Sequence, residues 1–285
     1  MLRSKVKQFI LNREPNKDGV VCLEGNDYRY LVRVRRLAVG EFFPAILPDG
    51  KETLVQILSI DRGALTGKCV PPEPETVFSE TAPNADKTQL PQIILFQSLP
   101  KGDKMDLIVR QAAEGGITEI VPFVSEFSIG KAKADGQKFS RWERLIKEAR
   151  QQSGSKIATA VHRECLTISG LFEYWGKLQK DGAGALGLLF HHTRLTAGGL
   201  VKKSLHGYLD SVPKFAALAI GPEGGFSERE VSLFLENDFK PFTIGDSVLR
   251  TETAALYCAA AVKIILLERD SWEPNKQKQD SASPF

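Results

Sequence analysis

Cysteine is scarce in this chain of 285 residues, and its four cysteines lie far apart. They are Cys22, Cys69, Cys165 and Cys258. No two form a Cys-x-x-Cys pair, which excludes the usual spacing of zinc sites and of disulfide frameworks and predicts reduced thiols. Histidine is equally scarce, and a strand would point the adjacent His191 and His192 to opposite faces. We therefore expect no metal site.

Long apolar runs are also missing. The longest, residues 254–267, is interrupted by Lys263 and is shorter than the roughly 20 residues that cross a bilayer. Residues 1–11 contain too short an apolar stretch for a signal peptide and no small-residue cleavage site. We expect a soluble, cytoplasmic protein with no membrane partner.

The composition that is present suits a globular protein of two domains. Hydrophobic residues make up 42% of the chain and charged residues 26%. Positive charge collects at the start, because residues 1–70 contain 12 Lys and Arg against 8 Asp and Glu, whereas the whole chain carries a formal charge of +3. This excess favours contact with a polyanion such as nucleic acid, although a solvated face has a similar composition.

Short apolar runs separated by turn signals fill the first 70 residues. They are residues 20–23, 30–34, 42–46 and 54–60. Short strands at this spacing predict a small β-barrel. Arg33, Arg35 and Arg36 are candidates for phosphate contacts or, alternatively, for charges that protect an exposed strand edge.

An α/β alternation follows a segment, residues 71–91, whose five prolines predict a linker. Strands are predicted at residues 93–97, 120–122, 186–190, 215–220 and 242–244, and helices near residues 103–115, 140–153, 197–206, 227–236 and 252–268. The alternation is typical of a mostly parallel sheet. The polar residues 270–285 predict a disordered tail.

Two glycine-bearing turns near the C-terminus are the most informative feature. The first, Gly221-Pro-Glu-Gly-Gly-Phe226, follows a predicted strand, and Ser227 with Glu230 forms a capping-box signature for the next helix. The second, residues 244–253, follows the next predicted strand and opens the last helix. Such turns at the carboxyl ends of parallel strands make a crevice where open α/β sheets bind ligands.

The motifs Gly221-Pro-Glu-Gly-Gly-Phe226 and Leu249-Arg-Thr-Glu-Thr-Ala254 together resemble the ribosomal RNA small subunit methyltransferase E family. Lys101-Gly-Asp-Lys-Met-Asp106 and residues 113–117 extend the resemblance upstream, so it covers most of the chain. It implies a SPOUT-type α/β fold with a C-terminal trefoil knot, preceded by a small PUA-like β-barrel that binds RNA. The implied domains are the barrel at residues 1–72, a linker at 73–91, the methyltransferase domain at 92–269 and the tail at 270–285.

The resemblance also implies an activity, which is S-adenosylmethionine-dependent methylation of N3 of one uridine in 16S ribosomal RNA. The expected partners are that RNA or the small ribosomal subunit, and a second copy of the chain joined through the last helix. The expected cofactor-binding residues are Leu189, Phe190, Ile220, Gly221, Pro222, Glu223, Gly224, Gly225, Ile244, Gly245, Val248, Leu249, Thr251 and Thr253.

Two charged residues beside these turns are candidates for the chemistry. Arg250 is expected to hold a uracil oxygen or a phosphate and to stabilise a developing anion. Glu252, or Glu223, is expected to orient the ligand or to accept a proton. The alternative for Arg250 and Glu252 is a salt bridge at the start of the last helix, and for Glu223 a stabilising role in its turn.

Several positions depart from the family pattern. Gln111 stands where the family usually has a basic residue, Phe127 where it has an arginine, and Ser155 at or next to another arginine. Lys156 is expected to contact RNA, but it replaces only the charge of a lost arginine and not its fork geometry. These departures leave two alternatives open, a methyltransferase of this fold acting on another RNA such as transfer RNA, and a non-catalytic RNA-binding or ribosome-assembly protein.

Overall fold

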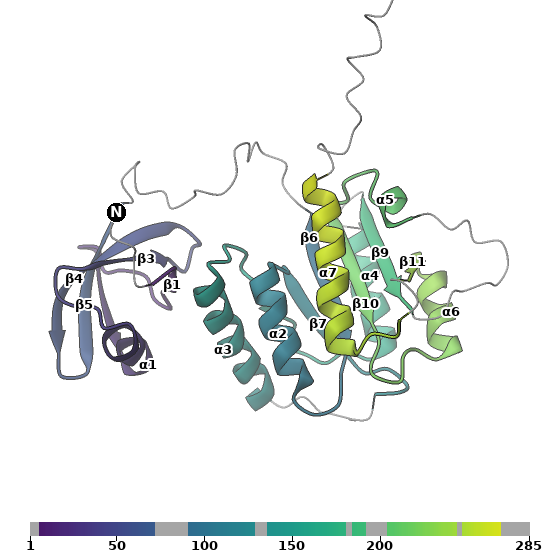
Figure 1. Ribbon diagram of the computed structural model, residues 1–285, viewed down its shortest axis with the longest axis horizontal. Coiled ribbons are helices and arrows are strands. Elements are labelled where there is room, and N and C mark those ends of the chain that lie inside the picture. Colours follow the sequence, from purple (N-terminus) through teal and green to yellow (C-terminus); the bar gives the residue numbers. More distant parts are fainter. Residues whose placement is uncertain are drawn as a thin grey trace, which may run out of the picture. The chain divides into compact units, whose positions relative to one another are not determined.

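The computed structural model describes residues 6–71, 91–128, 136–180, 184–191, 204–243 and 247–268 (Figure 1). Most of the expected linker and the whole expected tail lie outside these residues. The chain divides into two compact units. Unit 1 comprises residues 1–87 and 144–158, and unit 2 comprises residues 88–143 and 159–285. The division therefore passes through one helix, α3 (Gly136–Ser153).

Unit 1 is built on a five-stranded mixed sheet in the order β1-β3-β4-β5-β2. The strands are β1 (Phe9–Ile10), β2 (Val20–Glu24), β3 (Phe42–Ile46), β4 (Glu52–Asp61) and β5 (Ala64–Val70). The hydrophobic core of unit 1 includes the fully buried Phe9, Phe43 and Val55, which come from three strands of this sheet. Within the described residues β1 and β2 are the end strands and do not pair with each other, so the expected barrel is an open half-barrel.

The prediction of a strand at residues 30–34 was wrong. The chain there forms η1 (Arg29–Val34), a π-helical turn that directly continues α1 (Gly25–Tyr28). Leu31 is fully buried in the core of unit 1, and Tyr30 and Val32 pack against the same cluster. Burial of Leu31 from a helical segment outweighs the β propensity of the surrounding residues, because that propensity mainly reflects packing on a sheet.

Unit 2 contains a six-stranded sheet in the order β11-β9-β10-β6-β7-β8, in which every neighbouring pair is parallel. The strands are β6 (Gln92–Ser98), β7 (Glu119–Phe123), β8 (Ala160–Val161), β9 (Ala185–Phe190), β10 (Phe215–Ile220) and β11 (Phe239–Phe242). The helices besides α3 are α2 (Lys104–Gly115), α4 (Ile168–Lys180), α5 (Leu205–Tyr208), α6 (Glu228–Glu236) and α7 (Thr251–Glu268). The parallel sheet agrees with the predicted alternation, which missed β8 and α4.

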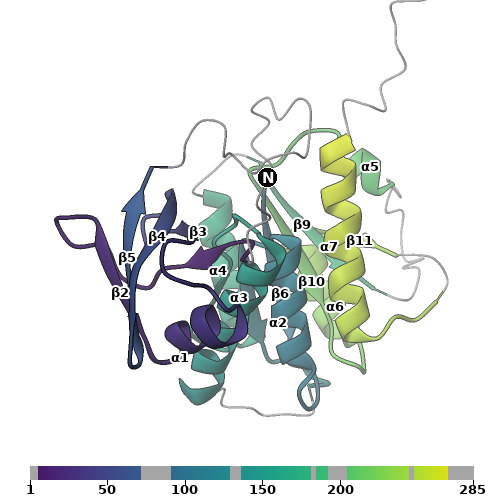
Figure 2. The same ribbon diagram turned by 60° about the vertical axis from the view of Figure 1, so that its left-hand side comes forward.

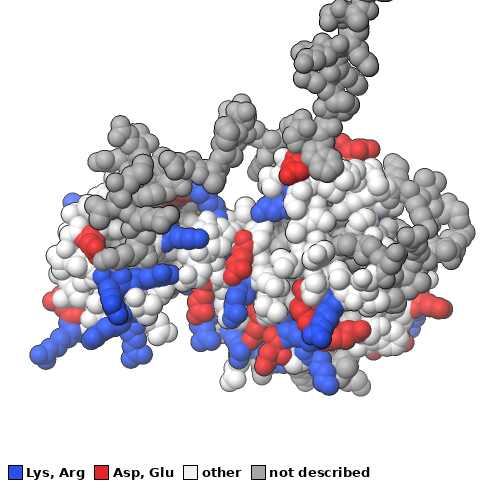
Figure 3. All heavy atoms as spheres, viewed as in Figure 1, with Lys and Arg blue, Asp and Glu red and all other residues white. Residues whose placement is uncertain are grey.

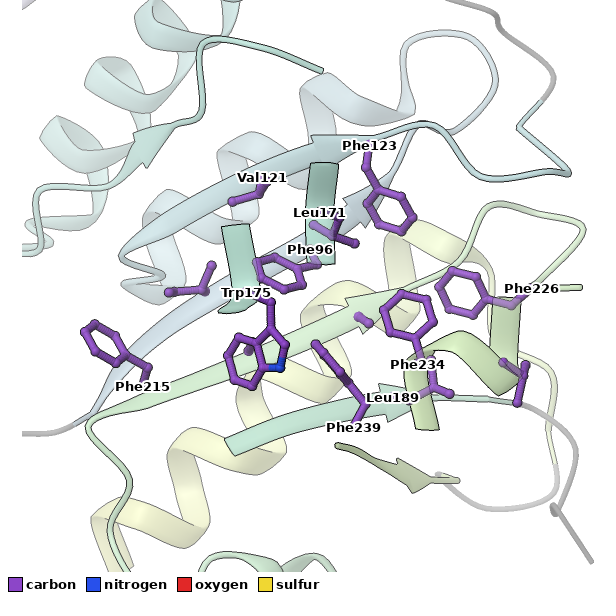
Figure 4. Close-up of a cluster of buried hydrophobic side chains, with 14 residues drawn as sticks. Phe96, Val121, Phe123, Leu171, Trp175, Leu189, Phe215, Phe226, Phe234 and Phe239 are labelled. Carbon is purple, nitrogen blue, oxygen red and sulfur yellow. The ribbon is translucent and has the colours of Figure 1, made fainter. Parts of the chain in front are cut away.

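Both faces of this sheet are covered by helices. On one face α2 packs against α7, and α7 contacts β6 and β10 (Figures 1 and 2). On the other face Trp175 of α4 and Phe234 of α6 join the aromatic cluster around Phe96 and Phe239 (Figure 4). Every residue of β10 is buried, as expected for a central strand enclosed on both sides.

The edge strand β11 is held in register by a close contact between a glycine and an aromatic ring. Gly187 of β9 lies directly opposite Phe239 of β11. A Cβ atom at Gly187 would lie 2.9 Å from the ring of Phe239, so no larger residue fits there without displacement. Phe239 is itself buried in the aromatic cluster, and the contact therefore ties β11 to the core.

Charge is distributed differently over the two units. Several Lys and Arg side chains project from unit 1 in the view of Figure 3, whereas both signs are interspersed over unit 2. None of the helices in the described ranges is long and apolar enough to cross a bilayer. Among the same residues no three His, Cys, Asp or Glu side chains are grouped as metal ligands would be.

Candidate functional site

A cavity of about 270 Å³ opens where β9, β10 and β11 end, and the last residue of each strand lines it. Both glycine-bearing turns contribute to its wall. Of the expected cofactor-binding residues, the structure brings together Phe190, Ile220, Gly221, Pro222, Glu223, Gly224, Gly225, Val248, Leu249 and Thr251. The crevice predicted from the two turns is therefore present in unit 2.

Two expected residues do not line the cavity. Leu189 is fully buried in the aromatic cluster, because alternate residues of a strand point to opposite sides and its neighbour Phe190 takes the cavity side. Thr253 lies in the first turn of α7 without reaching the cavity wall. Ile244 and Gly245 lie outside the described residues.

The cavity is also lined by seven residues that were not predicted from the sequence as cofactor-binding. They are His191, Phe226, Phe242, Thr243, Ser247, Ala254 and Cys258. Thr251, Ala254 and Cys258 follow one another at the spacing of a single helix face, so helical periodicity would have identified the last two. Burial raises the pKa of the Cys258 thiol well above its ordinary value, and this wall of the cavity is therefore uncharged.

The first turn is compact because its main chain packs against itself. The N–H group of Gly225 donates a hydrogen bond to the carbonyl oxygen of Pro222 at 2.9 Å, and Gly225 has a φ of 72°. A Cβ atom at Gly221 would lie 3.2 Å from the carbonyl carbon of Gly225. The predicted capping box is present, since Ser227 and Glu230 exchange side-chain and backbone hydrogen bonds at the start of α6.

A single hydroxyl group joins the second turn to the first. The side chain of Thr251 donates a hydrogen bond to the carbonyl oxygen of Gly221 at 2.7 Å and accepts one from Nε2 of Gln97 at 3.0 Å. Thr251 is 3% exposed and Gln97 is fully buried at the end of β6. Three segments that are far apart in the sequence therefore meet at one buried oxygen atom.

Two lysine residues contact the carboxylate of Glu223 beside the cavity. Its carboxylate accepts a hydrogen bond from Nζ of Lys104 at 2.6 Å and is also within reach of the backbone N–H of Lys101. Burial alone would raise the pKa of Glu223, but the hydrogen bonds from Lys104 and from the backbone of Glu223 and Lys101 hold it below its ordinary value. The same bond raises the pKa of Lys104, so this pair is ionised at neutral pH. Lys104 lies in a motif of the family resemblance but was not predicted as a site residue.

Glu252 and Arg250 do not form the salt bridge that was the alternative for them. Oε2 of Glu252 lies 3.8 Å from Nζ of Lys104, and this oxygen is buried without a hydrogen-bond partner among the described residues. The guanidinium of Arg250 is exposed and makes neither a hydrogen bond nor an ion pair with the part of the chain that the structure describes.

The expected RNA-binding residues of unit 1 differ in their surroundings. Arg35 donates hydrogen bonds to the hydroxyl of Tyr30 and to Oε1 of Gln152, both at 2.9 Å. Lys156 pairs with Glu52 at 2.6 Å, although both side chains are well exposed. Arg33 and Arg36 are exposed. Arg35 is therefore held in position by two hydrogen bonds.

Matches to known proteins agree with this arrangement. Residues 87–263 match the family described as RNA methyltransferase domain, and residues 23–68 match the family described as RNA methyltransferase PUA domain. A ribosomal RNA small subunit methyltransferase E of Synechocystis is 29% identical over 252 residues, which cover 87% of this chain and 74% of the relative. The protein of the same name from Bacillus subtilis is 27% identical over 84% of this chain and 88% of its own.

A solved structure shares the fold. It is a ribosomal RNA small subunit methyltransferase E from Neisseria gonorrhoeae bound to S-adenosylmethionine, with a TM-score of 0.70 and 24% identity over 90% of this chain and 97% of that one. The first family match spans well over half of the present chain. The chain therefore belongs to the RNA methyltransferase domain family, and its resemblance to the ribosomal RNA small subunit methyltransferase E family is confirmed.

Proposed function

We propose that this protein binds S-adenosylmethionine in the cavity of unit 2 and methylates N3 of one uridine in 16S ribosomal RNA. The observation that carries the proposal is the meeting of the two glycine-bearing turns around one cavity, with Thr251 bonded to Gly221. The names of the curated relatives and the cofactor of the structural relative support S-adenosylmethionine-dependent methylation of ribosomal RNA.

The cavity has the properties that this cofactor requires. Its volume of about 270 Å³ is just below the range of about 300–1,000 Å³ that is usual for small-molecule sites. Val248 and Leu249 provide apolar surface for the faces of an adenine ring, while Gly221, Gly224 and Gly225 present backbone groups without intervening side chains. Backbone amides and carbonyls there can hydrogen-bond the adenine edge and the polar ends of the ligand.

The protein's part in the reaction is orientation and charge stabilisation. The cofactor supplies a methyl group that its sulfonium already activates. Arg250, exposed beside the cavity, binds a uracil oxygen or the neighbouring phosphate and stabilises the negative charge that develops when the N3 proton leaves. Holding the base unstacked and aligned with the methyl group contributes a large part of the rate acceleration.

The two carboxylates are suited to different roles. Glu223 is engaged by Lys104 and has a lowered pKa, so it is a weak proton acceptor and serves to hold Lys104 beside the first turn. Glu252 keeps one buried oxygen without a hydrogen bond from any residue that the structure describes, 3.8 Å from the same ammonium. We assign to Glu252 the orientation of the substrate or the acceptance of its proton. The ammonium of Lys104, 3.8 Å from Glu252, influences either role through its positive charge.

RNA recognition belongs mainly to unit 1 in this proposal. Arg33 and Arg36 project into solvent, and Arg35 is held by Tyr30 and Gln152 in a position from which it can meet a phosphate. Lys156 adds charge but shares it with Glu52. These contacts position the RNA without reading its sequence.

Three further features complete the proposal. The first is the trefoil knot that the family resemblance implies, which we propose for the C-terminal part of unit 2. Apolar surface is exposed on α7 at Leu256, Tyr257, Ile264 and Leu267, which supports a homodimer formed through this helix.

We place the protein in the cytoplasm, where ribosomes are assembled.

The experiment that tests the proposal has two parts. Calorimetric titration with S-adenosylmethionine measures cofactor binding directly, and the alternative of a non-catalytic binding protein requires no binding at high cofactor concentration. Mass mapping of modified uridines in ribosomal and transfer RNA from a deletion strain then identifies the substrate. Loss of one N3-methyluridine from 16S ribosomal RNA is the expected result, and loss of a transfer RNA modification instead would overturn the assignment.

A further inference from the structure

An aromatic side chain is exposed beside the cavity of unit 2. Phe127, in the segment after β7, is 45% exposed, although most phenylalanines of this unit are buried in the core. A Cβ atom at Gly224 would lie 3.0 Å from the Cβ of Phe127, so Phe127 packs directly against the first glycine-bearing turn. Gly224 itself lines the cavity. The ring of Phe127 is thus at the rim of the proposed cofactor site.

The turn that carries Phe127 is fixed at both ends. The hydroxyl of Ser128 lies 2.9 Å from that of Ser98 at the end of β6, and it accepts a hydrogen bond from the backbone N–H of Ser125 at 3.1 Å. On the other side the N–H of Glu126 donates to Oε1 of the buried Glu230 at 2.8 Å. These bonds fix the backbone of the turn that carries the exposed ring of Phe127.

The surroundings of the ring match a nucleobase. The backbone N–H of Lys101 contacts Glu223, the neighbour of Gly224 in the first turn, and Lys101 is exposed, whereas the ammonium of Lys104 is paired with Glu223. Arg250 is exposed in the second turn beside the same cavity. Positive charge next to an exposed aromatic face is the combination that binds single-stranded nucleic acid, through phosphate contacts and base stacking.

We propose that Phe127 is a stacking platform for an unpaired RNA base next to the methylated uridine, which makes it a residue that determines how the substrate is held. This inference rests on the proposed function, because it assigns the ring to the RNA side of the same site. Phe127 does not line the cavity, so its contribution is to RNA binding and not to cofactor binding.

The test compares Phe127→Leu, which keeps an apolar side chain without a ring, with Phe127→Trp, which keeps and enlarges the ring. RNA affinity is measured by filter binding with 16S ribosomal RNA, and cofactor affinity by calorimetry. Stacking predicts that Phe127→Leu weakens RNA binding about tenfold. It also predicts wild-type cofactor affinity in both variants, and RNA binding at or above the wild-type level in Phe127→Trp, with quenching of the added tryptophan fluorescence by RNA.

Val212→Ala is the matched control, since Val212 is 41% exposed and precedes β10 at the opposite end of the sheet from the cavity. Unchanged RNA binding in Phe127→Leu would overturn the inference, as would equal losses in the leucine and tryptophan variants. Because binding is measured without turnover, stacking in a protein that methylates no RNA would reject the proposed function and keep only the role of Phe127 in holding an unpaired RNA base.

Discussion

The bond between Thr251 and Gly221 offers the most direct test of how the cavity is held together. Thr251→Val replaces the hydroxyl by a methyl group of similar size and removes both hydrogen bonds of that oxygen, to the carbonyl of Gly221 and from Gln97. Gln97 keeps its bond to the carbonyl of Ser98, but the Gly221 carbonyl loses this partner. Burying such a group unpaired costs about 1–3 kcal/mol. We expect the free energy of unfolding of Thr251→Val to fall by that amount.

Cofactor affinity should fall as well, because the bond positions the two turns that line the cavity. Each roughly 1.4 kcal/mol of this cost that is expressed in binding lowers affinity tenfold. Urea unfolding and calorimetric titration with S-adenosylmethionine measure the two effects, and Thr251→Ser, which keeps the hydroxyl, is the control. Wild-type cofactor affinity in a Thr251→Val protein that is measurably destabilised would refute the idea that this bond shapes the site.

Three other predictions concern groups around the cavity. Arg250→Lys should leave cofactor affinity unchanged and lower turnover on small-subunit particles at saturating cofactor by about tenfold or more, since lysine lacks the planar fork; equal turnover would remove Arg250 from the mechanism. The stability that Glu223 gains from Lys104 should be present above the ordinary glutamate pKa of about 4 and lost as the pH falls through the lowered pKa of Glu223. The difference in the free energy of unfolding between wild type and Glu223→Gln should thus become smaller as the pH falls. A difference that does not change with pH would contradict the ion pair between Glu223 and Lys104. Iodoacetamide at neutral pH should modify the exposed Cys22 well before Cys258, which burial keeps protonated. Mass spectrometry of the labelled peptides measures the order of modification, and faster labelling of Cys258 would contradict this prediction.

Local patterns predicted the parts of this structure that depend on neighbouring residues. The capping box of Ser227 and Glu230 spans four residues, and the parallel sheet follows from an alternation of elements along the chain. The bond between Lys104 and Glu223 joins residues 119 positions apart, so no local signal indicated it. At Leu31 a local signal was present but misleading. The surrounding residues have high β propensity and predicted a strand, whereas burial of Leu31 in the core favours the helical segment.

A consequence also follows from the pairing of Gly187 with Phe239. These residues lie three positions before the ends of β9 and β11, whose final residues Phe190 and Phe242 line the cavity. A substitution at Gly187 would push against the ring of Phe239 and shift the last strand, and the cavity wall would move with it. Natural or laboratory variants at Gly187 can therefore abolish ligand binding while leaving every residue that touches the ligand unchanged. When such variants are interpreted, Gly187 should be counted among the residues that the site requires, although it does not line the cavity.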